Sequence, residues 1–296
     1  MKDHSRVTVT YMRPSPGGPV PFDQESLGRE VPLSRPGGQS TLDPGISYAE
    51  YLGAVDRFIV NHWALLRDIL SEQTPLSSLA EARVELVAEK HGSDYHPARI
   101  VVHTGNLVHH FVVNVAITDR GKSRLANEFD LLNRLHRYHE RTFVPRPYIV
   151  GEEPLFGGKG SRAIASMFLA EWFQGFHEFH LSQQGTESSP KMVLWDLDRG
   201  YSLLSKSQEQ KIYRQAAFIM TYYYDLETYE EIFPWHHAAG DFVASCSESG
   251  IEVKLITVRQ YAPRVVFGQN SKDRRLEALL LFLANLTVRM RLDRLD

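Results

Sequence analysis

The sequence predicts an α+β fold in which a strand-rich half precedes a mainly helical half. Three segments rich in β-branched residues, joined by turns that contain glycine, lie between residues 84 and 117; this pattern is typical of antiparallel strands. Apolar residues recur at helical spacing over about 47–71, 123–140, 208–229 and 272–292. A chain of 296 residues is long enough for two domains, or for one domain with two lobes.

The composition is that of a folded protein and excludes several classes. The chain has 33 Lys and Arg against 36 Asp and Glu, a net charge of −3, so the totals favour neither nucleic acid nor a membrane surface as a partner. No apolar run approaches the roughly 20 residues that span a bilayer, and the first residues contain no signal-peptide pattern. We therefore expect a cytoplasmic protein. Cys246 is the single cysteine, which excludes an intramolecular disulfide and a cysteine-cluster metal site.

Residues 1–46 are expected to form a poorly ordered arm. Seven prolines and six glycines lie within residues 14–45, a density that disfavours both a helix and a central strand. Order is expected to begin at Ser47, because Ser47 and Glu50 have the spacing of a capping box. A helix over about 47–71 follows.

The next segments are predicted to be three strands, a helix and a further strand. Val84–Ala88, Arg99–His103 and Val108–Ile117 are predicted to form an antiparallel meander. A helix over Ser123–Glu140 follows, and a further strand covers Ala163–Glu171.

After Gly175 the chain is expected to be mostly helical. Helices over about 208–229 and 272–292 enclose two short strands, Phe242–Ser245 and Ile251–Ile256. The expected domains are an arm over 1–46, a leading helix with the strand-rich lobe and hinge over 47–175, and a helical lobe over 176–296.

This order of elements resembles the bilobal protein-kinase-like fold, which has a small antiparallel-sheet N-lobe and a mainly helical C-lobe. Two motifs resemble those of the aminoglycoside and choline phosphotransferases. Residues 168–175, Phe-Leu-Ala-Glu-Trp-Phe-Gln-Gly, resemble their hinge, and residues 234–243, Pro-Trp-His-His-Ala-Ala-Gly-Asp-Phe-Val, resemble their catalytic loop. The resemblance implies that ATP or another nucleotide binds between the lobes with Mg²⁺, and that a few fixed side chains carry phosphoryl transfer.

The resemblance also gives residues of this chain a place in the implied site. Glu128 holds the position of the helix-C glutamate, and Glu171 lies in the hinge, where backbone groups usually meet adenine. Asp241 holds the position of the catalytic-loop asparagine and is the expected Mg²⁺ ligand.

The remaining positions depart from the family pattern. Asn114 stands where the family has its strand-3 lysine, His236 where it has the catalytic aspartate, and Thr257 where it has the later metal-binding aspartate. Lys90 is an alternative source of the missing lysine. The phosphate loop is expected near residues 91–93, where only Gly92 is a glycine. Most charged groups of phosphoryl transfer are therefore replaced.

Three functions stay open at this point. The first is a pseudokinase-like protein that binds a nucleotide, a small ligand or a protein without catalysis. The second is an atypical ATP-dependent phosphotransferase with His236 as general base and Asp241 holding Mg²⁺. The third is a metal-dependent enzyme on another fold, built around His236 and Asp241. A structural role for His236, bonded to backbone in a tight loop, also stays open.

Overall fold

The computed structural model describes residues 7–32, 45–72, 74–79, 81–89, 92, 95–156, 162–183, 190–196, 200–236, 240–247, 250–267 and 274–291. The fold is α+β, as the sequence predicted, and the chain divides into two compact units. Unit 1 comprises residues 1–129 and 146–172, and unit 2 comprises residues 130–145 and 173–296.

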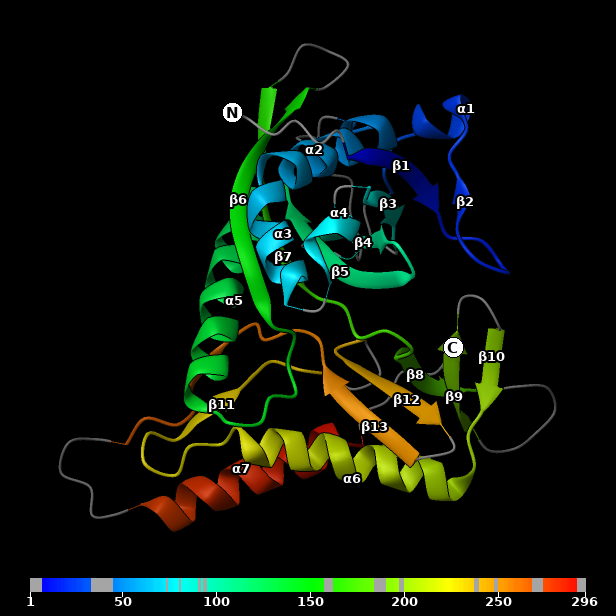
Figure 1. The fold of residues 1–296 in the computed structure, drawn as a ribbon. Helices are drawn as coiled ribbons and strands as arrows, with labels where there is room; N and C mark the ends of the chain where they lie inside the picture. The colour runs from blue at the N-terminus through cyan, green and yellow to red at the C-terminus, as the bar shows by residue number, and fades with distance from the viewer. Residues whose placement is uncertain are drawn as a thin grey trace. The chain divides into compact units, whose positions relative to one another are not determined.

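Unit 1 is built on a seven-stranded sheet of order β2-β1-β3-β4-β5-β7-β6 (Figure 1). Its strands are β1 (Thr8–Arg13), β2 (Val20–Pro21), β3 (Arg83–Ala88), β4 (His96–Thr104), β5 (Leu107–Ala116), β6 (Pro147–Phe156) and β7 (Arg162–Glu171). The antiparallel meander expected over 84–117 is confirmed as β3, β4 and β5. In contrast, β1 runs parallel to β3.

Helices α2 (Tyr48–Asn61) and α3 (Trp63–Ser71) confirm the helical segment expected over 47–71, which is divided at His62. The predicted capping box is present: the Glu50 N–H donates to the Ser47 hydroxyl, and the Ser47 N–H donates to the Glu50 carboxylate. The buried face of α2 shares one core with alternate residues of the strands, including Ile100 of β4 and Val113 of β5. Two short helices, α1 (Gln24–Leu27) and α4 (Leu76–Leu79), complete this unit.

The amino-terminal residues belong to this sheet, contrary to the expectation of a poorly ordered arm. Strand β1 lies between β2 and β3, with Thr10 opposite Glu85. Met12 is buried against Val87 and Val101. The composition was misleading because the prolines and glycines of residues 14–19 form the turn between β1 and β2, whereas residues 8–13 carry a strand pattern of their own. Residues 1–6 and 33–44 of the expected arm lie outside the described residues.

Helix α5 (Asp119–Tyr138) corresponds to the helix expected over 123–140, and the unit boundary falls within it. Leu125, Leu132 and Leu135 are buried on one side of it. Phe129 contacts Phe168 of β7, with ring centroids 5.9 Å apart.

Unit 2 contains more strands than the mainly helical half that was predicted. A five-stranded antiparallel sheet has the order β10-β9-β8-β12-β13, and β11 pairs separately with β14. These strands are β8 (His177–Ser182), β9 (Lys191–Asp196), β10 (Gly200–Leu203), β11 (Glu230–Ile232), β12 (Phe242–Ser247), β13 (Gly250–Leu255) and β14 (Tyr261–Pro263). The β12–β13 hairpin was expected. Strands β8 to β10 were missed because each has only four to six residues. Strands β8 and β10 contain few apolar residues, and the continuous apolar run of β9 has no period that separates a strand from a helix.

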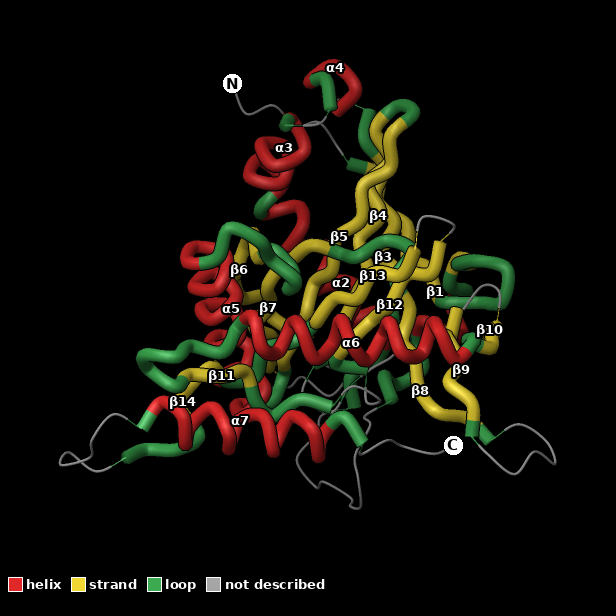
Figure 2. Tube along the Cα trace, turned by 90° about the horizontal axis from the view of Figure 1, so that it is seen from below, coloured by secondary structure: helices red, strands yellow, loops and turns green. Residues whose placement is uncertain are grey.

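Two helices complete unit 2, α6 (Lys206–Tyr222) and α7 (Arg275–Arg289). Figure 2 shows α6 beside the β12–β13 hairpin, where it packs on β13. Helix α6 ends earlier than the expected residue 229, because the Asp225 carboxylate accepts hydrogen bonds from the N–H groups of Glu227 and Thr228 and so forms a turn. In the described part of the chain, none of the helices has the length and apolar character needed to span a membrane.

Candidate functional site

The segment that resembles a catalytic loop lies in unit 2, between β11 and β12. Residues 237–239 of this segment, His237 among them, lie outside the described residues. Asp241 directly precedes β12, and its side chain is 3% exposed. The Ile256 N–H donates to the Asp241 carbonyl at 2.8 Å, which ties the loop to the end of β13. Thr257 is the next residue, so the structure brings the Thr257 and Asp241 positions of the predicted site together.

Arg259 engages both carboxylate oxygens of Asp241. Its Nη1 donates to Oδ2 at 2.7 Å, and its Nη2 donates to Oδ1 at 2.6 Å. The backbone N–H of His236 also donates to Oδ2, at 2.7 Å. Bidentate, charge-assisted pairs of this kind are among the strongest hydrogen-bonded contacts in proteins. A guanidinium therefore stands where the sequence analysis placed Mg²⁺.

The arrangement does not fit the metal site that was predicted at Asp241. A metal ion would have to displace the Arg259 guanidinium and the His236 N–H from the carboxylate. Within the described ranges, His, Cys, Asp and Glu side chains form no group of three or more that could hold a metal ion. The His236 contact to Asp241 is made by the backbone N–H and not by the imidazole, so the structural role of the His236 side chain stays a prediction. Its role as a general base stays a prediction.

The other three predicted residues lie in unit 1. Asn114 is on β5, in register with Phe168 of β7; because Val113 and Val115 face the core shared with α2, Asn114 lies on the opposite face. Glu128 is buried on α5. Glu171 ends β7, where its N–H donates to the Arg146 carbonyl and its carboxylate accepts from the Arg146 N–H. The resemblance implies that these residues face His236 and Asp241 across one cleft, and this stays a prediction.

A buried ion pair lies beside the segment that resembles a hinge. The Arg99 guanidinium lies 5.4 Å from the ring centroid of Trp172, the first residue after β7. Its Nε donates to the Glu89 carboxylate at 2.8 Å, and the two side chains are 18% and 9% exposed. Arg99 stands opposite Val112 of β5, on the same face of the sheet as Asn114. Displacing a desolvated, paired cation from an aromatic ring costs free energy, because the cation loses both its ion pair and its contact with the ring.

Arg99 and Arg259 were not among the site residues predicted from the sequence. The available signal was weak: Arg259 follows Thr257 by two residues, and an arginine near a segment whose metal-binding groups are replaced is a candidate substitute cation. Lys90, His91 and Ser93 lie outside the described residues, so the substitute lysine and the phosphate loop stay predictions.

Comparisons of the chain with family models, with curated proteins and with solved structures find no match. The function is therefore argued from the geometry of the chain itself.

Proposed function

We propose that this chain is a pseudokinase-like protein that binds a small ligand or a protein and does not transfer phosphate. The Asp241–Arg259 pair carries the proposal. Phosphoryl transfer of the kinase type requires carboxylates that hold a metal ion against the phosphates. In this chain the carboxylate of the catalytic-loop-like segment is instead neutralised by a guanidinium of the same unit.

The order of elements supports the kinase-like part of the proposal. In unit 1, three antiparallel strands are followed by α5 and by the β6–β7 hairpin, whose second strand inserts beside β5. In unit 2, α6 precedes the catalytic-loop-like segment and the β12–β13 hairpin follows it. This is the order that prompted the resemblance, although the amino-terminal strands and β8 to β10 are additions to it.

The Arg99–Glu89 pair bears on the kind of ligand. The resemblance assigns the region beside the hinge to adenine, and Arg99 lies against Trp172 in that region. We therefore propose that the ligand is a small molecule or protein other than a nucleotide, bound without Mg²⁺.

A thermal-shift series tests the proposal. ATP, ADP and GTP are each added with and without Mg²⁺ or Mn²⁺ to the full chain and to Arg99→Ala. A ligand at a hundred times its Kd adds about 2.7 kcal/mol to the free energy of unfolding, so binding is visible as a higher melting temperature. We expect no shift of the full chain with any nucleotide.

The competing function makes a different prediction for the same samples. An atypical phosphotransferase would show stabilisation by nucleotide that depends on Mg²⁺, and turnover that is lost in both His236→Ala and Asp241→Asn. That combination would show our proposal to be wrong. Nucleotide binding by Arg99→Ala alone would support the view that Arg99 occupies the region beside the hinge.

A further inference from the structure

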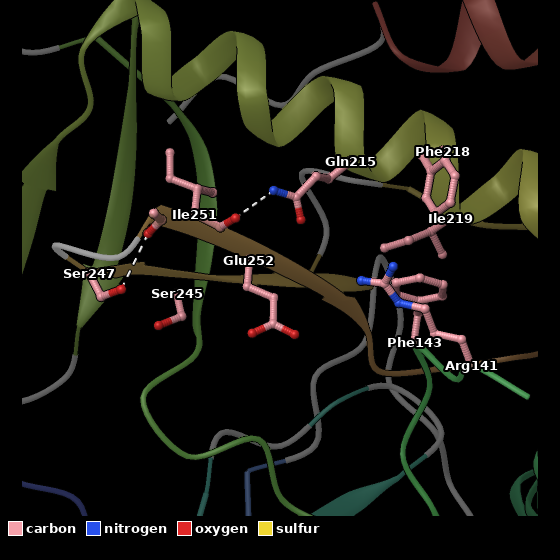
Figure 3. Close-up of a pocket in the computed structure, with 10 residues that line it drawn as sticks. Arg141, Phe143, Gln215, Phe218, Ile219, Ser245, Ser247, Ile251 and Glu252 are labelled. Atoms are coloured by element: carbon pink, nitrogen blue, oxygen red, sulfur yellow. Dashed lines mark hydrogen bonds between the residues drawn. The ribbon is translucent and has the colours of Figure 1, made fainter.

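Unit 2 contains a pocket of about 440 Å³ along the outer edge of β13 (Figure 3). It is lined by residues of the 141–143 segment, α6 and the β12–β13 hairpin: Arg141, Phe143, Gln215, Phe218, Ile219, Ser245, Ser247, Gly250, Ile251 and Glu252. All of these belong to unit 2. The volume lies within the range of small-molecule sites.

The backbone edge of β13 is paired in part with groups of unit 2, which disfavours an added peptide strand. The Gln215 side chain donates to the Ile251 carbonyl and accepts from the Val253 N–H. Further along, the Leu255 N–H donates to the Phe143 carbonyl at 2.9 Å. Because these contacts already occupy part of the free edge of the sheet, we consider recognition of a ligand by the side chains of the pocket.

Arg141 is the side chain best placed to recognise an anion. Its guanidinium lies over the Phe143 ring, 4.7 Å from the centroid, and within the described part of the chain it makes no hydrogen bond or ion pair. In contrast, Glu252 is paired with Lys254 at 2.9 Å. The unpaired cation at the pocket is therefore Arg141, and its planar donors match a carboxylate in two-point geometry.

The remaining lining offers one polar and one apolar wall. Ser245 stands directly opposite Glu252 in the hairpin, and its hydroxyl makes no hydrogen bond to any described residue. On α6, Phe218 is half exposed and Ile219 lies one residue further on. A ligand with an apolar body against Phe218 and a carboxylate at Arg141 would contact the apolar wall and the cation together.

We propose that this pocket binds a small carboxylic acid with an aromatic or apolar body. The proposal deepens the proposed function, because it names a ligand class and a site for the small-ligand alternative. The site itself depends on unit 2 alone and needs no nucleotide, metal or kinase chemistry.

The test is a titration of the full chain with 3-phenylpropionate, followed by the methyl signals of ¹³C-labelled isoleucines. Saturable shifts are expected for Ile219 and Ile251, which line the pocket, but not for Ile59 and Ile100 in the core of unit 1. The neutral analogue 3-phenylpropan-1-ol should bind at least tenfold more weakly, because it loses the charge-assisted contact.

Two arginine variants locate the charge that binds the acid. Arg141→Gln should weaken the binding of 3-phenylpropionate at least tenfold. Arg214→Gln should leave its affinity unchanged, because Arg214 is an exposed neighbour on α6 that does not line the pocket. The proposal is overturned if Ile219 and Ile251 do not shift, if the alcohol binds as well as the acid, or if both variants weaken binding equally.

Failure of this test is distinguishable from failure of the proposed function. Absence of acid binding removes the pocket assignment and leaves the nucleotide series unaffected. Mg²⁺-dependent turnover removes the proposed function and leaves the acid titration unaffected.

Discussion

The Asp241 carboxylate is shielded from solvent: its side chain is 3% exposed, and Arg259 contacts both of its oxygens. Removing a carboxylate from water costs several kcal/mol unless a partner compensates for it. The Arg259 side chain is 38% exposed, so the pair is desolvated mainly on the carboxylate side. The loop therefore depends on Arg259 for charge compensation.

Arg259→Gln should lower the free energy of unfolding by about 3 kcal/mol, because it leaves a buried charge without its partner. Urea unfolding of the two proteins measures this. Adding Asp241→Asn to the variant should restore more than half of the loss, since the uncompensated charge is then removed. As a control, Lys206→Gln breaks the exposed pair with Glu209 and should cost less than about 1 kcal/mol. Equal effects of the two single substitutions would contradict the argument.

His110 on β5 is a second residue whose charge state matters. Burial lowers its pKa to about 4, and the positive charges of Arg99, His103 and His109 act in the same direction. Its Nδ1 is buried and has no hydrogen-bond partner among the described residues. The folded protein therefore favours the neutral imidazole.

The sign of the resulting pH dependence follows from linkage. The pKa of His110 in the folded state lies below its unfolded value of 6.5, so the stabilising contribution is complete above about pH 6.5 and is lost as the pH falls toward 4. The full shift corresponds to about 3 kcal/mol, which screening by solvent at this partly exposed side chain reduces to about 1–2 kcal/mol.

His110→Gln should therefore reduce the loss of stability between pH 6.5 and pH 4 by about 1–2 kcal/mol. Urea midpoints at several pH values measure it, and the difference between the two proteins at pH 8 supplies the packing effect to be subtracted. Parallel pH profiles for the two proteins would mean that His110 does not contribute.

At the scale of elements, β1 is the clearest case of a strand that depends on a distant partner. It pairs with β3 through residues 75 positions further along the chain, such as Thr10 with Glu85. The Tyr11 hydroxyl donates to the Asp56 carboxylate of α2 at 2.9 Å. Met12 is 8% exposed and packs with Val87 and Val101. The strand is thus held by backbone, polar and apolar contacts.

Met12→Ala should cost about 2–3 kcal/mol of stability, because it removes buried apolar volume from this cluster. Thr10→Ala is the matched control, since its side chain is exposed on the same strand, and it should change stability by less than about 0.5 kcal/mol. Chemical unfolding measures both. If the two variants are equally stable, residues 8–13 are not an integral part of the sheet.

At the scale of the whole molecule, the chain crosses between the units three times, after Phe129, Pro145 and Trp172. Unit 2 is consequently not a continuous segment. Its residues 130–145 supply Arg134, which pairs with Glu230, and Phe143, whose N–H donates to the Tyr223 hydroxyl at 2.9 Å. Burial raises the pKa of Tyr223 to about 12, so this hydroxyl stays neutral at physiological pH.

A fragment of residues 173–296 should therefore not fold cooperatively, because it lacks these partners. Circular dichroism during urea unfolding of the fragment measures this, with the full chain as reference. In the full chain, Tyr223→Phe should cost about 1–3 kcal/mol, because the Phe143 N–H is left without its acceptor. A cooperative transition of the fragment, together with no effect of Tyr223→Phe, would show that residues 130–145 are dispensable.

The sequence by itself determined the elements whose signals are local. The capping box of Ser47 and Glu50 spans three residues, and the meander and the β12–β13 hairpin join strands that follow one another in the chain. Such elements are predictable because side-chain period, caps and turns act over a few residues. The motif positions of Asp241 and Thr257, in contrast, come from the resemblance and stay a prediction.

Only the tertiary structure decided which distant groups meet. No periodic pattern in the sequence indicates the parallel pairing of β1 with β3, the contact of Arg99 with Trp172 or the pairing of Arg259 with Asp241. Each of these contacts joins residues that are distant in the sequence. The composition of the chain is the same whether or not these residues meet. For this reason the sequence predicted a metal at Asp241, where the folded chain instead supplies its own cation.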